Sequence, residues 1–276
     1  MVKRVSVRNA QFQQWQALLG NRTKRQRAGE FLIHGVRPIT LAIECGWPLT
    51  AVLRTAGPKL SGWAQGVLET VDAPVYSVAA DLMAELSERT DDGVELIAVG
   101  AVPPDSLDRV PITPDMLVVA FDRPTSPGNI GAITRSCDAL GAAALIVTGH
   151  AADPYDPKSV RATTGSLFAV PTVRVGSPRD VGEWVEAVRS QGTPLTIVGT
   201  DEHGPSRITE VDLTGPTLLV IGNETKGMST TWHTLCHTTL HIPIGGAASS
   251  LNAANAATLT LYEAARQRGF PAAAPR

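Results

Sequence analysis

The fold of this chain is decided by the stretch MLVVAFDRPTSPGNIGAITR, residues 116–135. An apolar run at 116–121 is followed by a loop rich in proline and glycine, and then by a helical pattern that starts at 130. A short apolar run of this kind indicates a strand buried on both faces, as in a parallel sheet covered by helices. Comparable runs are found at 144–147, 195–198, 217–221 and 240–242. We therefore expect an α/β domain with a mainly parallel sheet and helices at 130–140, 180–190, 229–236 and 251–268.

The first hundred residues predict a smaller α/β unit. Its strands are expected at 31–33, 52–53, 75–78 and 96–99, and its helices at 10–19, 36–45, 59–70 and 80–88. Residues 102–114 contain four prolines, which is typical of a linker. A chain of 276 residues also exceeds one typical domain. We therefore expect two domains, residues 1–104 and 105–276.

The composition excludes several classes of protein. With 43% hydrophobic and 18% charged residues, the chain does not have the composition of a disordered protein. It has no uninterrupted apolar stretch of the length of a membrane span, and its N-terminus lacks the apolar segment of a signal peptide. The three cysteines, Cys45, Cys137 and Cys236, lack metal-binding spacing. They are expected to be reduced thiols of a cytoplasmic protein.

Charge is distributed unevenly along the chain. The net charge is −2, yet residues 1–29 hold seven basic and no acidic residues, which leaves −9 for the rest. Four of the seven, Arg22, Lys24, Arg25 and Arg27, fall in a loop expected at 21–29. A basic arm on an acidic body favours a polyanionic partner, with a merely solvated basic segment as the alternative.

Three polar loops follow predicted strands, at 122–135, 221–229 and 242–255. Ligands of open α/β sheets bind at the carboxyl ends of strands, so these loops are the candidate site. The glycine fingerprint of dinucleotide-binding folds is absent, as are the P-loop, H-E-x-x-H and G-x-S-x-G motifs. Metal-like spacing links four residues near 235, but without a carboxylate or second cysteine a helix end is the preferred interpretation. The four are His233, Cys236, His237 and His241.

The three loops resemble the signature motifs of the SpoU family of RNA ribose 2′-O-methyltransferases, within the knotted SPOUT superfamily. The first motif is NIGAITR at 129–135, with Gly141 ending the helix, and the second is GNETKG at 222–227. The third comprises Ile242-Pro243 and SLN at 250–252, which opens a helix containing Glu263. Residues 21–37 are similar to the ribosomal-protein-like (L30e-like) substrate-binding domain that precedes many SpoU domains. In detail the chain resembles the antibiotic-resistance 23S rRNA methyltransferases of the avilamycin (orthosomycin) type.

The resemblance implies a trefoil knot in the C-terminal domain, a homodimer, S-adenosylmethionine as cofactor, and no metal. It implies that the catalytic or substrate-organising residues are Asn129, Arg135, Glu224, Ser250 and Asn252. The cofactor-binding residues would be Thr200, Gly222, Asn223, Gly227, Ile242, Ser250 and Leu251. RNA would be bound by Arg22, Lys24, Arg25, Arg27 and Arg37.

The implied roles can be weighed against physical chemistry. Ile242 and Leu251 would sandwich the adenine. Arginine keeps its proton at any ordinary pH, so Arg135 is expected to grip the phosphate beside the reacting ribose, while that phosphate or water accepts the 2′-hydroxyl proton. Asn129 and Ser250 would orient the ribose, although each could instead be a helix N-cap. Apolar residues of the final helix are expected to form a seam for a second subunit, namely Leu251, Ala254, Leu261 and Ala265.

The sequence is therefore interpreted as an S-adenosylmethionine-dependent ribose 2′-O-methyltransferase that acts on RNA. The expected substrate is 23S rRNA, and resistance to a ribosome-targeting antibiotic is the expected consequence. The alternatives are a tRNA 2′-O-methyltransferase, a non-catalytic RNA-binding protein with a decayed SPOUT fold, and a Rossmann oxidoreductase. The complete catalytic set argues against decay, and the missing glycine fingerprint argues against the oxidoreductase.

Overall fold

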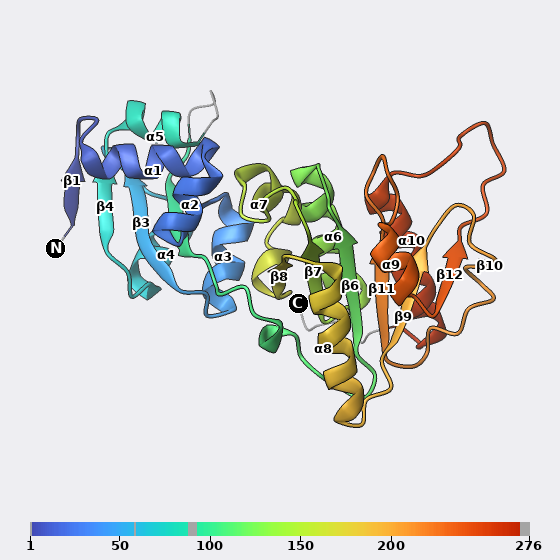
Figure 1. Ribbon diagram of the computed structural model, residues 1–276. Coiled ribbons are helices and arrows are strands. Elements are labelled where there is room, and N and C mark those ends of the chain that lie inside the picture. Colours follow the sequence, from blue (N-terminus) through green and yellow to red (C-terminus); the bar gives the residue numbers. More distant parts are fainter. Residues whose placement is uncertain (1, 58, 88–92, 271–276) are drawn as a thin grey trace. The chain divides into compact units, whose positions relative to one another are not determined.

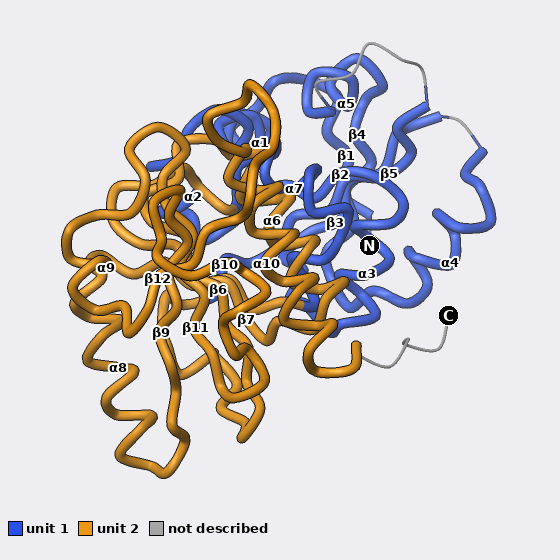
Figure 2. Tube along the Cα trace, turned by 90° about the vertical axis from the view of Figure 1, so that its right-hand side faces the viewer, with its two compact units in different colours: residues 1–103, 155–169 blue, residues 104–154, 170–276 orange. Residues whose placement is uncertain are grey.

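The computed structural model describes residues 2–57, 59–87 and 93–270 (Figure 1). The chain forms two compact units, which Figure 2 shows in different colours. The first comprises Met1–Pro103 and Tyr155–Ala169, and the second comprises Pro104–Pro154 and Val170–Arg276. The expected division after residue 104 differs from this observed division in one segment, because residues 155–169 pack with the N-terminal unit.

The first unit contains a five-stranded sheet with the order β1-β4-β3-β5-β2. The pairs β1–β4 and β3–β4 are parallel, whereas β3–β5 and β2–β5 are antiparallel. The sequence analysis missed the first of these strands. The strands are β1 (Lys3–Val5), β2 (Glu30–His34), β3 (Leu49–Thr55), β4 (Val75–Val78) and β5 (Leu96–Ala101).

Helices bury both faces of this sheet. One core cluster includes residues of α1 (Ala10–Gly20) and α5 (Ala80–Ser87), among them Phe12, Trp15 and Leu18. The other includes residues of α3 (Val36–Glu44), α4 (Gly62–Thr70), α7 (Pro157–Thr163) and the 3₁₀ helix η2 (Ser166–Phe168). Val160 of α7 shares this second cluster with Phe31 of β2, which explains why 155–169 belongs to the first unit.

The basic segment after Gly20 is a helix, α2 (Arg22–Ala28), where the sequence predicted a loop. The Asn21 side chain accepts a hydrogen bond from the Lys24 N–H at 3.0 Å and so caps the helix. Gly29 ends it in the left-handed conformation, with φ at 65°. The first helix ends at Gly20, as expected, and Asn21 both closes α1 and opens the second helix, which the sequence analysis missed.

The second unit contains a seven-stranded sheet with the order β10-β12-β9-β11-β6-β7-β8. Its strand pairs are parallel throughout the described residues, which confirms the expected sheet. The sequence analysis missed β8 and β10. The strands are β6 (Leu117–Asp122), β7 (Ala144–Thr148), β8 (Thr172–Val175), β9 (Thr196–Thr200), β10 (Ser206–Arg207), β11 (Thr217–Ile221) and β12 (Thr238–His241).

This sheet is covered on both faces, as expected. One core cluster includes residues of α6 (Pro127–Leu140) and α10 (Ala253–Gln267), and the other includes residues of α8 (Pro178–Ser190) and α9 (Thr230–Leu235). Alternate residues of β6 enter the two clusters, so Val119 lies in the first and Val118 in the second. The segment expected as a linker contains only a short 3₁₀ helix, η1 (Leu107–Arg109).

The final helix returns across the sheet after β12 and packs against α6 and β11. Its residues Ala254, Leu261 and Ala265 are buried in the protein's own interior, at 6%, 0% and 1% exposure. The expected seam for a second subunit is therefore wrong for these three residues. The exposed apolar side chains of α10 are instead Leu259 and Tyr262, at 44% and 51%.

Candidate active site

The three predicted loops meet where the sheet of the second unit changes its winding direction. From β6 the chain proceeds to β7 and β8 on one side, and then to β9 and β11 on the other. The adjacent strands β6 and β11 end at Asp122 and Ile221, and their loops leave from the same edge of the sheet. Such a switch point in a parallel sheet is where a ligand crevice forms.

Glu224, in the loop after β11, accepts the hydrogen bonds that connect this loop to the loop after β6. Its Oε2 accepts from the Thr125 N–H at 3.1 Å and from the Thr125 hydroxyl at 3.2 Å. Its Oε1 accepts from the Ser126 N–H at 3.2 Å and from the Asn129 Nδ2 at 3.0 Å. The Glu224 carboxylate therefore accepts four hydrogen bonds from the start of α6 and the residues just before it.

Asn129 passes this connection on to the third loop. The Asn252 Nδ2 donates to the Asn129 Oδ1 at 3.3 Å, so the three motifs form one hydrogen-bonded chain.

The alternative role as a helix N-cap is wrong for both Asn129 and Ser250. Ser126, rather than Asn129, caps α6, and Asn252, rather than Ser250, caps α10.

A cavity of about 820 Å³ lies against these loops, within the size range of small-molecule sites. Every residue predicted to bind the cofactor lines it. These residues are Thr200, Gly222, Asn223, Gly227, Ile242, Ser250 and Leu251. The catalytic candidate Glu224 lines it as well, whereas Asn129 and Asn252 stand behind Glu224 in the hydrogen-bonded chain.

The second loop suits a bound nucleoside because its backbone folds tightly. A Cβ at Gly222 would lie 2.6 Å from the Met228 nitrogen and 2.7 Å from the Gly227 carbonyl carbon, so no larger residue fits. Gly227 itself adopts the left-handed region with φ at 63°. Apolar Ile242 and Leu251 in the same lining provide surfaces for a flat ring. These features fit S-adenosylmethionine.

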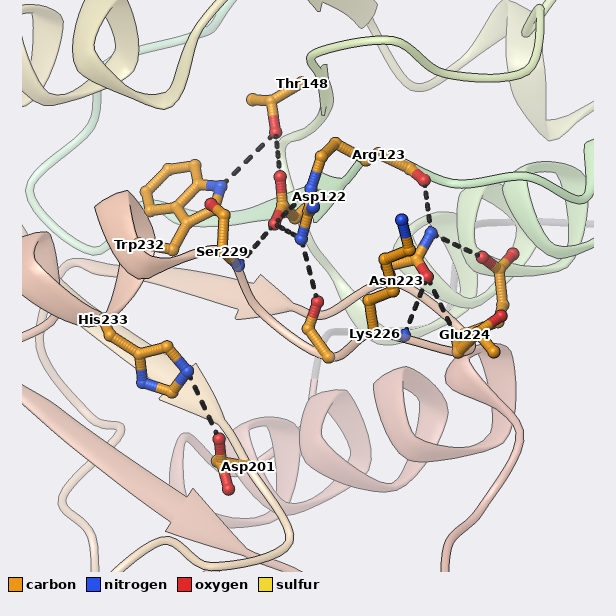
Figure 3. A network of polar contacts seen from close by, with 12 residues as sticks. Asp122, Arg123, Thr148, Asp201, Asn223, Glu224, Lys226, Ser229, Trp232 and His233 are labelled. Atoms are coloured by element: carbon orange, nitrogen blue, oxygen red, sulfur yellow. Dashed lines mark hydrogen bonds and ion pairs between the residues drawn. The ribbon is translucent and has the colours of Figure 1, made fainter.

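The sequence analysis missed a polar pair in the cavity wall. The His233 Nε2 lies 3.5 Å from the Asp201 Oδ2, and both residues line the cavity (Figure 3). An acidic residue directly after a buried strand is the only signal that could have pointed to Asp201. His233 thus belongs to the cavity wall rather than to a histidine cluster.

The other histidines of the weighed metal motif have separate partners. His237 Nε2 accepts from the Arg189 guanidinium at 2.7 Å, and His241 Nδ1 lies 2.7 Å from the Gly204 carbonyl oxygen. Burial raises the pKa of Cys236 to about 12, which disfavours the thiolate needed for metal binding. Over the described part of the chain, no three His, Cys, Asp or Glu side chains are arranged to hold a metal ion.

Arg135 stands apart from the other catalytic candidates. It is exposed on α6, six residues after Asn129, and is not part of the cavity lining. Within the described residues its side chain makes no hydrogen bond or ion pair with a protein group. Its guanidinium is therefore available to a ligand that reaches over α6, such as a nucleic-acid backbone.

The basic arm contains one residue that the prediction misplaced. Arg25 is only 2% exposed, donates to the Leu18 carbonyl at 2.7 Å, and pairs with Asp156 at 3.2 Å. It is a structural arginine of the first unit and cannot reach an RNA phosphate. Lys24, Arg27 and Arg37 are exposed and Arg22 is half-buried, so these four remain RNA-binding candidates.

Residues 9–98 match the model of the SpoU L30e-like domain, and residues 116–262 match that of the SpoU rRNA Methylase family. The chain is also 60% identical over 266 residues to the 23S rRNA (uridine(2479)-2′-O)-methyltransferase of Streptomyces viridochromogenes, a match that covers 96% of this chain and 93% of the relative. The chain belongs to the SpoU rRNA methylase family.

Solved SpoU structures extend this match to three dimensions. The SpoU methyltransferase AviRb of Streptomyces viridochromogenes, in complex with AdoMet, superimposes with a TM-score of 0.91 at 61% identity, covering 95% of this chain and 98% of that chain. The AdoMet-bound rRNA methyltransferase of Sinorhizobium meliloti gives a TM-score of 0.85 at 26% identity, covering 96% and 98%. The expected fold class, an L30e-like domain followed by a SPOUT methyltransferase domain, is confirmed.

None of the helices described combines the length and apolarity needed to cross a bilayer.

Proposed function

We propose that this SpoU-family protein transfers the methyl group of S-adenosylmethionine to a ribose 2′-hydroxyl of 23S rRNA. The observation that carries this proposal is the hydrogen-bonded chain from Glu224 through Asn129 to Asn252, beside a cavity lined by all seven predicted cofactor residues. One relative of Streptomyces viridochromogenes supports it, because it is named a 23S rRNA uridine 2′-O-methyltransferase and its structure, AviRb, is solved with AdoMet. We accordingly assign a uridine ribose as the acceptor.

The cofactor would supply an electrophilic methyl group, and the chain's residues would place it. Ile242 and Leu251 offer the adenine its apolar contacts. Because Gly222 has no side chain, the backbone around it could approach the cofactor and would bind its polar edges. Asp201 and His233, in the same lining, are available to the hydroxyl groups or the amino-acid end of the cofactor.

The acceptor is proposed to bind against the catalytic set. Asn129 and Ser250 orient the ribose, while Glu224 and Asn252 hold Asn129 in place. Arg135 keeps its proton, so we assign it to the adjacent phosphate rather than to general-base catalysis. The phosphate or a water molecule then accepts the 2′-hydroxyl proton as the methyl group is transferred.

Two further features belong to this proposal. The rRNA backbone is bound by four basic side chains, because guanidinium and ammonium groups replace its counterions. These side chains are Arg22, Lys24, Arg27 and Arg37.

A homodimer forms over the exposed apolar side chains of α10, Leu259 and Tyr262. The Tyr262 ring also makes an edge contact with Phe270, with 5.3 Å between the ring centroids. An enzyme with this substrate works in the cytoplasm.

The test uses purified protein, methyl-labelled S-adenosylmethionine and three separate acceptors: 23S rRNA, 16S rRNA and bulk tRNA. Label is expected on 23S rRNA alone. Arg135→Ala should abolish transfer while cofactor affinity, measured by calorimetry, stays within a few-fold. Label on tRNA would favour the tRNA enzyme, and RNA binding without transfer would favour the non-catalytic alternative.

A second test is cellular. Expression of this protein in a susceptible bacterium should lower the sensitivity of that bacterium to an orthosomycin antibiotic.

A further inference from the structure

Two residues that do not line the cavity, Asp122 and Arg123, make polar contacts with the loop after β11, which does line it (Figure 3). The first is Asp122, whose side chain is completely buried at the end of β6. Its Oδ2 accepts from the Ser229 N–H at 2.8 Å, and its Oδ1 accepts from the Thr148 hydroxyl at 3.2 Å. A buried carboxylate also needs a countercharge, and Arg123 provides it at 2.9 Å. Asp122 therefore fixes the end of the loop at Ser229.

The second residue, Arg123, has an unusual backbone. Its φ is 48°, in the left-handed region that bulky residues rarely adopt. Its N–H donates to the Thr148 carbonyl at 2.9 Å, and its side chain crosses Gly149, where a Cβ would lie 2.9 Å from the Arg123 Cγ. The neighbouring strand end thus makes room for an arginine in a strained conformation. Such strain persists where surrounding contacts enforce it, and functional sites are where it concentrates.

Those contacts run to the cofactor loop. The Arg123 carbonyl accepts from the Asn223 Nδ2 at 2.6 Å, and the Arg123 guanidinium donates to the Gly227 carbonyl at 3.2 Å. Asn223 and Gly227 are paired with each other by two backbone hydrogen bonds of 3.0 Å. Arg123 therefore holds both ends of the turn that carries Glu224. Because Gly222 has no free space around it, a small displacement of this turn would change the cavity wall.

We propose that Arg123, paired with the buried Asp122, is a positioning residue that sets the shape of the loop 222–227 and thereby the affinity for S-adenosylmethionine. The proposal rests on the cofactor assignment made above. One arginine holds the carboxylate and the Gly227 carbonyl together, which a planar guanidinium can do and a single ammonium group cannot do in the same geometry.

The test measures cofactor binding by calorimetry for wild type, Arg123→Gly and Arg123→Lys. Glycine accepts the backbone conformation without strain, so it removes the side-chain interactions alone. We expect Arg123→Gly to weaken binding of S-adenosylmethionine and S-adenosylhomocysteine by about tenfold, with Arg123→Lys in between. Amide exchange at Asn223 and Gly227 in the ligand-free protein should accelerate, since these two N–H groups bond within the turn that Arg123 holds.

A matched control is Arg174→Lys. Arg174 pairs with Asp105 at 2.8 Å and with the buried Asp153 at 3.7 Å, away from the cavity lining. This variant should bind the cofactor as wild type does. Wild-type affinity in folded Arg123→Gly would overturn the proposal, and if that variant fails to fold, wild-type affinity in Arg123→Lys would do so. A wild-type protein that binds no cofactor would instead contradict the proposed function, and the exchange rates at Asn223 and Gly227 would then decide the positioning role.

Discussion

At the scale of single residues, Glu224 links the three motifs because it is an acceptor surrounded by donors. Burial raises the pKa of its carboxyl group, but the hydrogen bonds from Asn129 and from backbone N–H groups outweigh this effect, so the pKa is lowered overall. A lowered folded-state pKa means that ionisation stabilises the fold above the ordinary pKa of about 4.3. That contribution disappears as the pH falls through the folded-state value.

Glu224→Gln tests this role. The amide would turn an N–H₂ group toward donors from Thr125, Ser126 and Asn129, so it removes hydrogen bonds without a change of size. We expect a decrease of about 1 kcal/mol in the free energy of unfolding, since the group is only half-buried, and a fall in methyl transfer of at least about tenfold. Denaturant unfolding should show this difference in full from about pH 8 to about pH 5, and the difference should decrease below the ordinary pKa of about 4.3 as the pH falls through the lowered folded-state value. A difference that grows toward acid would contradict the assignment.

At the scale of elements, the sequence predicted strands best where both faces are buried. β6, β7 and β11 are continuous apolar runs, and their parallel arrangement followed. β10 has only two residues, too few for a periodic signal. α7 was missed because it packs against β2, a strand far from it in the sequence, and no local pattern shows which core a helix joins.

The site shows the same division. The seven cofactor-binding candidates that line the cavity were predicted through the family resemblance, whose motifs lie at strand ends. Asp122, Arg123, Asp201 and His233 were not predicted, because their importance lies in pairings between separate segments of the chain. Arg25 was misplaced for this reason too, since its partner Asp156 is 131 residues away.

The final helix offers a prediction about its two faces. Leu261→Ala removes a completely buried side chain and should cost about 2–5 kcal/mol in unfolding free energy, with the oligomeric state unchanged. The double change Leu259→Ala and Tyr262→Ala should instead leave the far-ultraviolet circular dichroism intact and shift the protein from dimer to monomer in light scattering. A double variant that stays dimeric would place the dimer interface elsewhere.

At the scale of the whole molecule, each unit has its own core and its own proposed task. The sheet of the first unit is buried on both faces, and so is that of the second. The cofactor cavity is lined by the second unit alone, while four basic RNA-binding candidates belong to the first. Mutations in the arm should therefore separate RNA affinity from cofactor affinity.

The arm is tested by comparing two sets of changes within α2. Replacing Arg22, Lys24 and Arg27 with alanine should weaken rRNA binding and reduce the salt slope by about 0.7–0.9 for each phosphate that is no longer neutralised. Cofactor affinity should not change, because the cofactor cavity is lined by the second unit alone. Arg25→Ala should do the reverse, lowering stability by about 1–3 kcal/mol because buried carbonyl oxygens are deprived of their donor, with the salt slope preserved. Equal salt slopes for wild type and the triple variant would show that the arm does not bind RNA.

The most direct test of the whole account is the chemical position of the transferred methyl group. Wild-type protein is incubated with labelled S-adenosylmethionine and 23S rRNA, and the RNA is then digested to nucleosides and, in parallel, hydrolysed with alkali. We predict label in 2′-O-methyluridine and in an alkali-resistant dinucleotide, with none when Arg135→Ala replaces the wild type. Label on a base, or no label from a folded protein that binds the cofactor, would contradict the assignment of a ribose methyltransferase.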